Sequence, residues 1–181
     1  MAVILESDRL LFRDHEPEDL EPFCVMEADP EVRRFVGGAP RSREGAEAKF
    51  RNVYLQPAPD RMALWATVYK PEGRYIGYCG VYPYFDDRGG AIPGEGVLAF
   101  YLARPYWGRG LATEAGQAFL HFGFEQLGLS RIVATVQMGN DASVRVLAKL
   151  KLSRGNTQTG GRHSYYFYEI TRQAWAASLV G

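Results

Sequence analysis

Residues 106–115 read Tyr-Trp-Gly-Arg-Gly-Leu-Ala-Thr-Glu-Ala, and they join a strand to a helix through a short glycine-flanked turn. The preceding residues 96–102 are an apolar, aromatic run of strand length. The following residues 111–127 are rich in helix formers and carry a broad apolar stripe. Two glycines let backbone N–H groups turn toward a ligand, and the helix start adds its positive dipole end. The stretch therefore predicts an anion site that suits a pyrophosphate.

The two glycines alone are also compatible with a simple turn. Two better-known phosphate loops are excluded by the letters around them. There is no Gly-Lys-Ser/Thr ending, so the stretch is not a nucleotide triphosphatase loop. No third glycine follows Gly108 and Gly110, so the dinucleotide fingerprint is incomplete and a dinucleotide oxidoreductase is disfavoured.

The pattern Trp107-x-x-Gly110-x-Ala112 resembles the acetyl-CoA pyrophosphate loop of the GCN5-related N-acetyltransferases (GNAT superfamily). That loop usually reads Gln/Arg-x-x-Gly-x-Gly/Ala, and Trp107 stands at the Gln/Arg position. This departure resembles the RimJ/RimL-like, or ribosomal-protein-alanine acetyltransferase-like, branch. Its members often read Tyr-Trp-Gly-Lys/Arg-Gly-x-Ala-Thr-Glu-Ala, which is nearly the stretch at 106–115.

Other segments are similar to the same branch: 6–13, 17–20, 29–35, 76–80, 140–147 and 171–175. The resemblance therefore covers roughly residues 4–178, and it implies one GNAT N-acetyltransferase domain with those bounds. The implied fold class is α/β (α+β). Its central sheet is mixed and largely antiparallel, helices flank it, and its fourth and fifth strands are splayed.

Periodicity and turn signals place the individual elements along the chain. Strands are predicted at 5–14, 62–69, 74–84, 96–102, 132–138, 152–158 and 163–170. Helices are predicted at 17–28, 29–36, 42–55, 111–127 and 141–150, with Ser42 as an N-cap. Residues 85–95 are predicted to be a loop. The order of strands in the sheet comes from the resemblance.

Composition describes one ordinary globular domain. The chain has 181 residues, 46% of them hydrophobic, which suffices for a single core. The 21 basic and 21 acidic residues cancel, which argues against nucleic acid as a partner. Apolar runs are too short to span a bilayer, and residues 1–6 lack the features of a secretory signal. We expect a cytoplasmic protein, a monomer or a homodimer, with Cys24 and Cys79 as reduced, packed thiols.

Metal is not expected, because three histidines and two cysteines lie at scattered positions without ligand spacing. The resemblance implies acetyl-CoA as the acetyl donor instead. It places the pantetheine arm along the fourth strand, against main-chain groups of Phe100 and Leu102. It also assigns the pyrophosphate loop, which consists of Trp107, Gly108, Arg109, Gly110, Leu111, Ala112 and Thr113.

Three residues of this proposed cofactor site have competing interpretations. Arg109 is expected to add charge to phosphate binding, although it could be a solvated loop arginine. Trp107 is expected to pack as an apolar wall while the backbone binds the anion. The resemblance implies that Asn140 contacts the cofactor arm, whereas a capping role is the alternative.

Acetyl transfer to an amine requires a held donor, a neutral amine and stabilised charge on the thioester carbonyl. The resemblance implies that Ser143 lies near the thioester, where it polarises the carbonyl or protonates the departing thiolate. An ordinary first-turn position is the alternative. The family's glutamate position on the fourth strand holds Val97, but Glu95 projects to the same face and is one candidate base.

His163 is the second candidate base, because it is the strongest titratable residue in the last third of the chain. Both candidates could instead be exposed loop or turn residues. The amine could also lose its proton to water before it binds. Some of the numerous aromatic residues could wall the acceptor site: Tyr82, Tyr84, Phe85, Tyr101, Tyr165, Tyr166 and Tyr168.

The sequence thus predicts an acetyl-CoA-dependent N-acetyltransferase. It would move an acetyl group directly to a primary amine, either a protein N-terminus or a small molecule. The alternative is an inactive acyl-CoA-binding sensor or partner-binding protein of the same fold, which the unusual Val97 and Lys151 leave open. Neither nucleic acid nor membrane is an expected partner.

Overall fold

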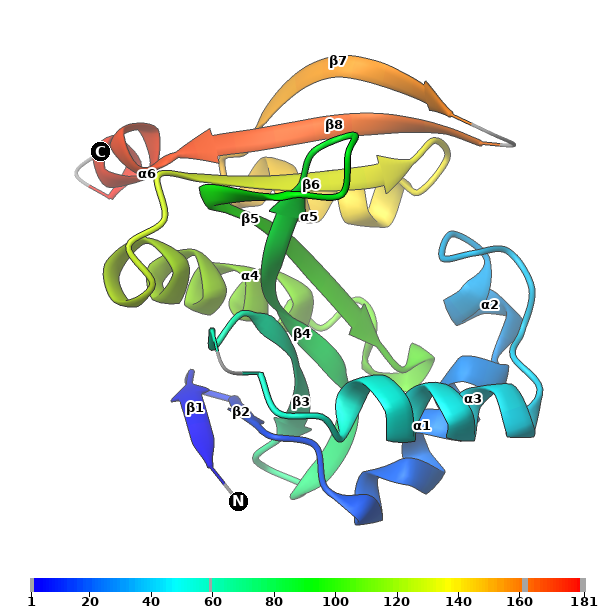
Figure 1. The fold of residues 1–181 in the computed structure, drawn as a ribbon. Helices are drawn as coiled ribbons and strands as arrows, with labels where there is room; N and C mark the ends of the chain where they lie inside the picture. The colour runs from blue at the N-terminus through cyan, green and yellow to red at the C-terminus, as the bar shows by residue number, and fades with distance from the viewer. Residues whose placement is uncertain (1, 59, 161–162, 180–181) are drawn as a thin grey trace.

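The computed structural model describes residues 2–58, 60–160 and 163–179, and these form one eight-stranded sheet (Figure 1). The strand order is β1-β2-β3-β4-β5-β6-β8-β7. The strands are β1 (Val3–Glu6), β2 (Leu10–Arg13), β3 (Ala63–Tyr69), β4 (Arg74–Phe85), β5 (Ala91–Leu102), β6 (Arg131–Gln137), β7 (Ser153–Gly160) and β8 (His163–Thr171). Only β5 and β6 pair in parallel, so the predicted mixed, largely antiparallel sheet is confirmed.

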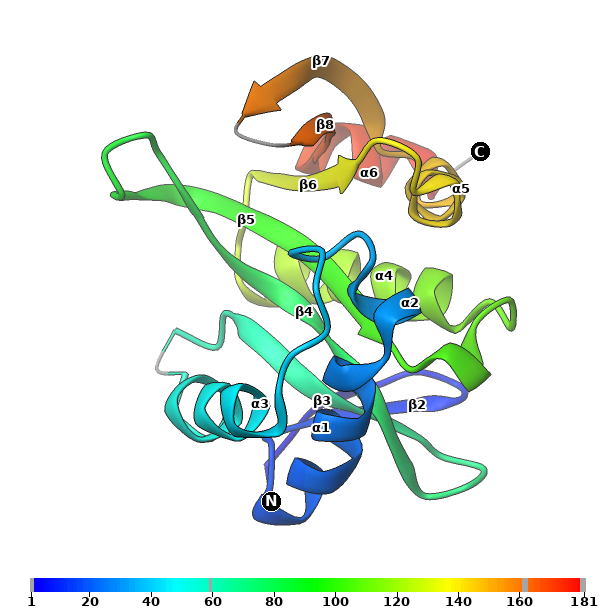
Figure 2. The ribbon, with the colours of Figure 1, turned by 90° about the vertical axis from the view of Figure 1, so that its right-hand side faces the viewer.

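Helices cover both faces of the sheet. They are α1 (Leu20–Ala28), α2 (Pro30–Arg33), α3 (Arg43–Lys49), α4 (Leu111–His121), α5 (Asp141–Lys149) and α6 (Arg172–Ser178). A 3₁₀ turn precedes α1, and single π-helical turns at Phe50–Tyr54 and Phe122–Gln126 prolong α3 and α4. Figure 2 shows α1 and α2 in front of the central strands and α4 behind them.

Two hydrophobic clusters correspond to these two faces. The larger one joins α4, α5 and α6 to one face, around Phe12, Phe119 and Ile132. The smaller one joins α1 and α3 to the opposite face, around Phe23 and Tyr78. The chain therefore places its helices where alternating strand residues present apolar side chains on both sides.

The single strand predicted at 5–14 is wrong, because the chain makes a hairpin there. Residues 7–9 turn between β1 and β2, and the Ser7 N–H donates to the Leu10 carbonyl over 2.9 Å. The Ser7 hydroxyl also accepts from the Leu10 N–H over 3.2 Å. Short polar side chains that bond the nearby backbone favour such turns.

The loop predicted at 85–95 is also mostly strand. β4 runs to Phe85 and β5 begins at Ala91, so only residues 86–90 turn the chain. The Asp86 carboxylate accepts from the N–H groups of Arg88 and Gly90, over 2.9 and 2.8 Å. This local bonding lets a five-residue turn replace the expected long loop.

β5 and β6 separate after a short contact. They pair only from Glu95 to Val97 on β5 and from Arg131 to Val133 on β6. β5 then continues to Leu102 and β6 to Gln137, and Figure 2 shows the two strands diverging. The predicted splay is confirmed. The stretches 98–102 and 134–137 do not pair with each other, and we call the gap between them the β5–β6 opening.

Candidate active site

The glycine turn leads from the end of β5 into α4. Gly108 and Gly110 have φ values of +71° and +80°, a left-handed conformation that favours glycine. No side chain caps α4, so its first-turn N–H groups are available to a ligand. A Cβ atom on Gly108 would meet nothing within 4 Å, and one on Gly110 would meet only the Arg9 guanidinium, at 3.5 Å. Backbone donors and open space thus suit an anion here.

Glu114, which sequence reasoning did not assign, fixes this turn to the rest of the fold. Its carboxylate accepts from the Ser7 hydroxyl, the Arg9 N–H and the Arg9 Nε over 2.7, 2.8 and 2.7 Å. Arg9 in turn donates from Nη1 to the Arg109 carbonyl over 3.0 Å. The Glu114 side chain therefore positions the turn through the β1–β2 hairpin.

Arg109 is exposed but held beside two tyrosines. Its Nη2 donates to the Tyr69 hydroxyl over 2.8 Å. Its guanidinium carbon lies 4.6 Å from the ring centroid of Tyr69 and 5.3 Å from that of Tyr106. Cation–π contacts of this kind fix where the charge sits. The two tyrosines thus hold the guanidinium next to the turn, although the residue is exposed.

Trp107 is 45% exposed beside the glycine turn. Its indole N–H donates to the Leu102 carbonyl over 2.6 Å, at the end of β5. The tryptophan therefore ties the glycine turn to the last residue of the strand. The indole N–H makes this bond, while the apolar faces of the ring stay available as the predicted wall.

Phe100 and Leu102 turn their side chains toward the larger hydrophobic cluster. A ligand in the β5–β6 opening would therefore meet their main-chain groups, which have no strand partner on the β6 side. The Leu102 carbonyl already accepts from Trp107. The remaining unpaired groups are suited to a ligand that bonds like an added strand.

Asn140 and Ser143 follow the free end of β6, where α5 begins. The Asn140 Oδ1 accepts from the Ser143 N–H over 3.2 Å, so the capping geometry is present. The Asn140 amide nitrogen has no hydrogen-bond partner within the described part of the chain. Asn140 can therefore fill both of the roles considered for it, because its side-chain oxygen caps α5 and its amide nitrogen is free for a ligand.

The two candidate bases differ in what the structure describes. Glu95 accepts from Arg131 Nη2 over 2.7 Å, and Arg131 Nη1 donates to Glu169 over 2.8 Å. This network sits where β5 and β6 still pair, on the closed side of the opening. The carboxylate of Glu95 thus has a structural partner. The side chain of His163 lies outside the described residues.

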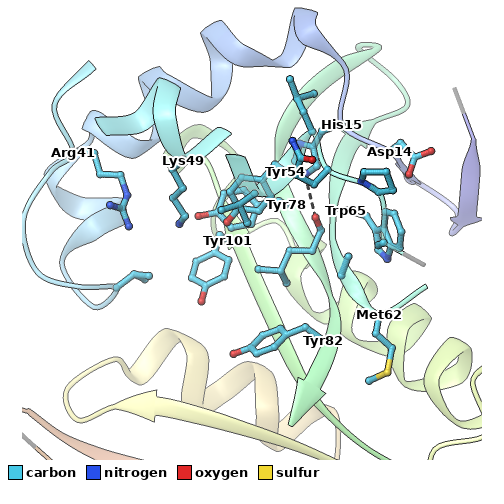
Figure 3. Close-up of a pocket in the computed structure, with 18 of the residues that line it drawn as sticks. Asp14, His15, Arg41, Lys49, Tyr54, Met62, Trp65, Tyr78, Tyr82 and Tyr101 are labelled. Atoms are coloured by element: carbon cyan, nitrogen blue, oxygen red, sulfur yellow. Dashed lines mark hydrogen bonds between the residues drawn. The ribbon is translucent and has the colours of Figure 1, made fainter. Parts of the chain in front are cut away.

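A cavity of about 990 Å³ lies between the part of the chain that carries α1–α3 and the strands β3, β4 and β5, and we call it the α1–α3 pocket (Figure 3). Among the helices, α2 and α3 contribute lining residues. Its walls include Lys49 and Tyr54 from the end of α3, Tyr78 and Tyr82 from β4, and Tyr101 from β5. Tyr78 pairs with Tyr101 across the strands, with ring centroids 4.8 Å apart. β5 thus forms a wall of this pocket and a wall of the β5–β6 opening. Sequence analysis named Tyr82 and Tyr101 as possible wall residues but had no signal for the others.

One buried carboxylate organises the charged end of the pocket. Glu27 is 1% exposed, and it accepts from the Tyr78 hydroxyl over 2.7 Å, from Arg41 Nε over 2.6 Å and from Arg33 Nη1 over 3.2 Å. Burial raises the pKa of Tyr78, so its hydroxyl stays a donor. Three donors thus satisfy the carboxylate.

His15 lines the same pocket as a neutral ring. Burial lowers the pKa of His15 from 6.5 to about 4. Its Nε2 lies 3.1 Å from the Leu64 carbonyl, so the neutral ring donates from Nε2 and keeps an acceptor at Nδ1. No described residue bonds that Nδ1 atom.

The described residues show neither a metal-binding cluster nor a membrane-spanning helix. They contain no group of three or more His, Cys, Asp or Glu side chains placed to hold a metal ion. None of their helices has both the length and the apolar character needed to cross a membrane.

Comparison with known proteins identifies the family of the chain. Residues 9–153 match the family described as "Acetyltransferase (GNAT) domain". The chain is 29% identical over 155 residues to an uncharacterized N-acetyltransferase, p20, of Bacillus licheniformis, with 83% of this chain and 82% of the relative covered. The chain therefore belongs to the GNAT acetyltransferase family.

Solved structures show the same fold. A GNAT-family acetyltransferase from Bacillus anthracis superposes with a TM-score of 0.80 at 23% identity, covering 93% of this chain and 98% of that one. An aminoglycoside acetyltransferase, AAC(6')-Ib, solved in complex with coenzyme A, gives a TM-score of 0.76 at 19% identity, with 94% and 99% covered. Acetyl transfer from acetyl-CoA is the general chemistry of this family.

Proposed function

We propose that this protein is an acetyl-CoA-dependent N-acetyltransferase that passes the acetyl group directly to a primary amine. The β5–β6 opening is the observation that carries the proposal, because it ends at an uncapped helix start with free N–H donors. The α1–α3 pocket adjoins the same strand and gives an acceptor a place to bind. A protein that only sensed acyl-CoA would not need this second cavity. We take the catalytic domain to span residues 4–178.

Acetyl-CoA, when bound, supplies the activated acetyl group. The main chain of β5 would orient the pantetheine arm, and the amides of residues 108–113 would bind the pyrophosphate. Arg109, anchored on Tyr69 and Tyr106, would add positive charge beside the phosphates. The Asn140 amide nitrogen would bond the arm from the side of β6.

In the transfer, the amine nitrogen forms a bond to the acetyl carbon, and the bond from that carbon to sulfur breaks. The departing thiolate takes a proton, for which we propose the half-buried Ser143 hydroxyl. The amine gives up two protons: the one that the nitrogen sheds after the new bond forms restores the Ser143 hydroxyl, and the one that its ammonium form loses before the attack needs another acceptor. Glu95 and His163 stay candidate acceptors for it, and loss to water before binding is favoured by the pairing of Glu95 with Arg131.

The experiment is a panel of amines with detection of the free thiol of coenzyme A. The panel includes an N-terminal peptide, an amino acid, a polyamine and an aminoglycoside. We expect thiol release that depends on an amine and matches the acetylated product one to one. Ser143→Ala should lower kcat more than it raises KM, because its proton is needed chiefly in the transition state. Binding of acetyl-CoA without any amine-dependent release would instead indicate the sensor.

Two substitutions then examine the proton acceptor. If either residue is a dedicated base, Glu95→Gln or His163→Gln should cost roughly 100- to 10,000-fold in turnover and alter the pH profile. We expect Glu95→Gln to keep most turnover, because the carboxylate already serves Arg131. Full turnover with an unchanged pH profile in both variants would leave proton loss to water as the mechanism.

A further inference from the structure

The α1–α3 pocket carries its charge unevenly. Arg33, Arg41 and Lys49 line one end of it, with Glu27 buried behind the two arginines. Figure 3 shows Asp14 beside Trp65 at the other end, away from Arg41 and Lys49. The first end thus has three cationic side chains and one carboxylate among the described residues. Two of these three positive charges are therefore not balanced by a carboxylate.

Lys49 is the cation without a protein partner. Within the described part of the chain it has neither an ion pair nor a hydrogen bond, and it contacts two aromatic rings. The ammonium nitrogen lies 5.3 Å from the Tyr54 ring centroid and 5.9 Å from that of Tyr78. Figure 3 shows it reaching into the space between Arg41 and the tyrosines.

A partly buried charge such as that of Lys49 is unfavourable unless an opposite charge or a hydrogen-bond partner compensates for it. Burial lowers the pKa of Lys49, Glu27 opposes this shift, and the charges of Arg41 and Arg33 add to it. An anion bound between Lys49 and Arg41 would supply the missing partner. Glu27 cannot do so, because Tyr78, Arg33 and Arg41 already use it.

Tyr101 connects the α1–α3 pocket to the strand that borders the β5–β6 opening. This residue stands on β5, next to the strand edge that opens toward β6, and it shares the pocket with Lys49. A molecule whose anionic group meets Lys49 would therefore extend along the tyrosines toward β5. Its amine would reach the side where the acetyl group is expected.

On the basis of the proposed function, we propose that the acceptor is an amine that also carries a carboxylate, which Lys49 and Arg41 bind at the cationic end of the α1–α3 pocket. The carboxylate belongs either to a free amino acid or to an acidic residue beside a peptide's free N-terminus. Polyamines and aminoglycosides, which carry only positive charge, are poor substrates on this account because Lys49 and Arg41 repel them.

The test compares acceptors that differ only in the carboxylate. L-phenylalanine and L-phenylalaninamide form one pair, and the peptides Ala-Glu-Ala-amide and Ala-Gln-Ala-amide form the other. Wild-type kcat/KM should favour the acid of at least one pair by about 10- to 100-fold, as expected for a charge-assisted contact. The first pair reports a free amino acid, and the second reports a peptide. L-phenylalaninamide has the more readily deprotonated amine, so a preference for the acid would not come from proton loss.

Substitution of Lys49 locates the contact. Lys49→Met should remove most of the preference by raising KM for the acid alone, and Lys49→Arg should restore it. Arg88→Met is the matched control, because Arg88 is exposed on the β4–β5 turn and does not line the pocket. Calorimetric binding of the preferred acid to wild type and Lys49→Met, in the presence of coenzyme A, gives a readout that needs no turnover.

Several results would overturn the inference. They are equal use of acid and amide by wild type, better use of spermidine than of either acid, and an equal loss for both members of a pair in Lys49→Met. If amines are acetylated without preference for the acid, the inference fails and the proposed function stands. If no amine is acetylated, the proposed function fails, and equal calorimetric affinities of wild type and Lys49→Met would reject the carboxylate site as well.

Discussion

The β5–β6 opening and the α1–α3 pocket share one strand but are built in different ways. The opening, together with the glycine turn that follows β5, uses backbone groups of residues 98–113. The pocket uses side chains from segments that lie between residues 14 and 101. A site made of contiguous backbone can keep its geometry through changes of side chain, whereas a pocket made of side chains can change its ligand without changing the fold. The difference predicts that mutations will separate the two sites.

The largest separation should come from Glu27→Ala. Removing this carboxylate leaves Arg33, Arg41 and the Tyr78 hydroxyl without their buried acceptor, which should lower the free energy of unfolding by about 3 kcal/mol. Urea unfolding measures this loss, with the exposed Glu31→Ala as control. At low temperature, the folded fraction should still bind acetyl-CoA with normal affinity. Loss of cofactor affinity in proportion to acceptor affinity would show that the two sites are not separate.

The pocket should also make stability depend on pH. The pKa of buried His15 is about 4, below its ordinary value of 6.5, so the unfolded chain binds more protons between these values. Stability is therefore full above pH 6.5 and is lost as the pH falls toward 4, by roughly 3 kcal/mol.

This pH dependence can be assigned by substitution. His15→Gln should flatten the dependence of the unfolding free energy between pH 6.5 and 4, whereas the exposed His121→Gln should leave it as in wild type. An equally steep loss of stability in His15→Gln would place the responsible group elsewhere.

Gly110→Val tests the glycine turn at the end of the β5–β6 opening. A β-branched residue at φ +80° is strained, and its side chain would stand where a pyrophosphate meets the backbone. We expect a roughly 10- to 100-fold loss of acetyl-CoA affinity by calorimetry. Gly128→Val introduces similar strain at φ +71°, outside the loop, and should lower stability without changing affinity. Equal acetyl-CoA affinities of Gly110→Val and wild type would refute the loop assignment.

Asn140→Ala should have the smallest effect of this series. Loss of the cap on α5 should cost about 1 kcal/mol of stability, which a melting temperature reports. If the free amide nitrogen also binds the cofactor arm, affinity for acetyl-CoA should fall several-fold. A lower melting temperature with unchanged affinity would leave Asn140 with the capping role alone.

The same contrast explains what could be predicted from sequence. The stretch at 106–115 combines turn chemistry, helix start and a family pattern in ten consecutive letters, so it located the opening and the fold around it. The hairpin at residues 7–9 combines local bonds between Ser7 and Leu10 with bonds to Glu114, which lies more than one hundred residues away. No local pattern contains such a contact.

The pocket was largely missed for a related reason. Glu27, Arg33 and Arg41 look like solvated charges in a sequence, and only the fold of α1 over β4 buries them together with Tyr78. Lys49 stands out because no described residue forms an ion pair or a hydrogen bond with it. A sequence does not show which side chains lack a partner. The cationic end of the pocket is thus a property of tertiary packing.

We place acetyl-CoA in the β5–β6 opening and not in the α1–α3 pocket. Hydrogen exchange of the backbone amides, measured by mass spectrometry with and without acetyl-CoA, tests this directly. The account predicts slower exchange at residues 98–102 and 108–113, with little change in peptides from residues 49–65. Protection confined to residues 49–65, with none at 108–113, would contradict it.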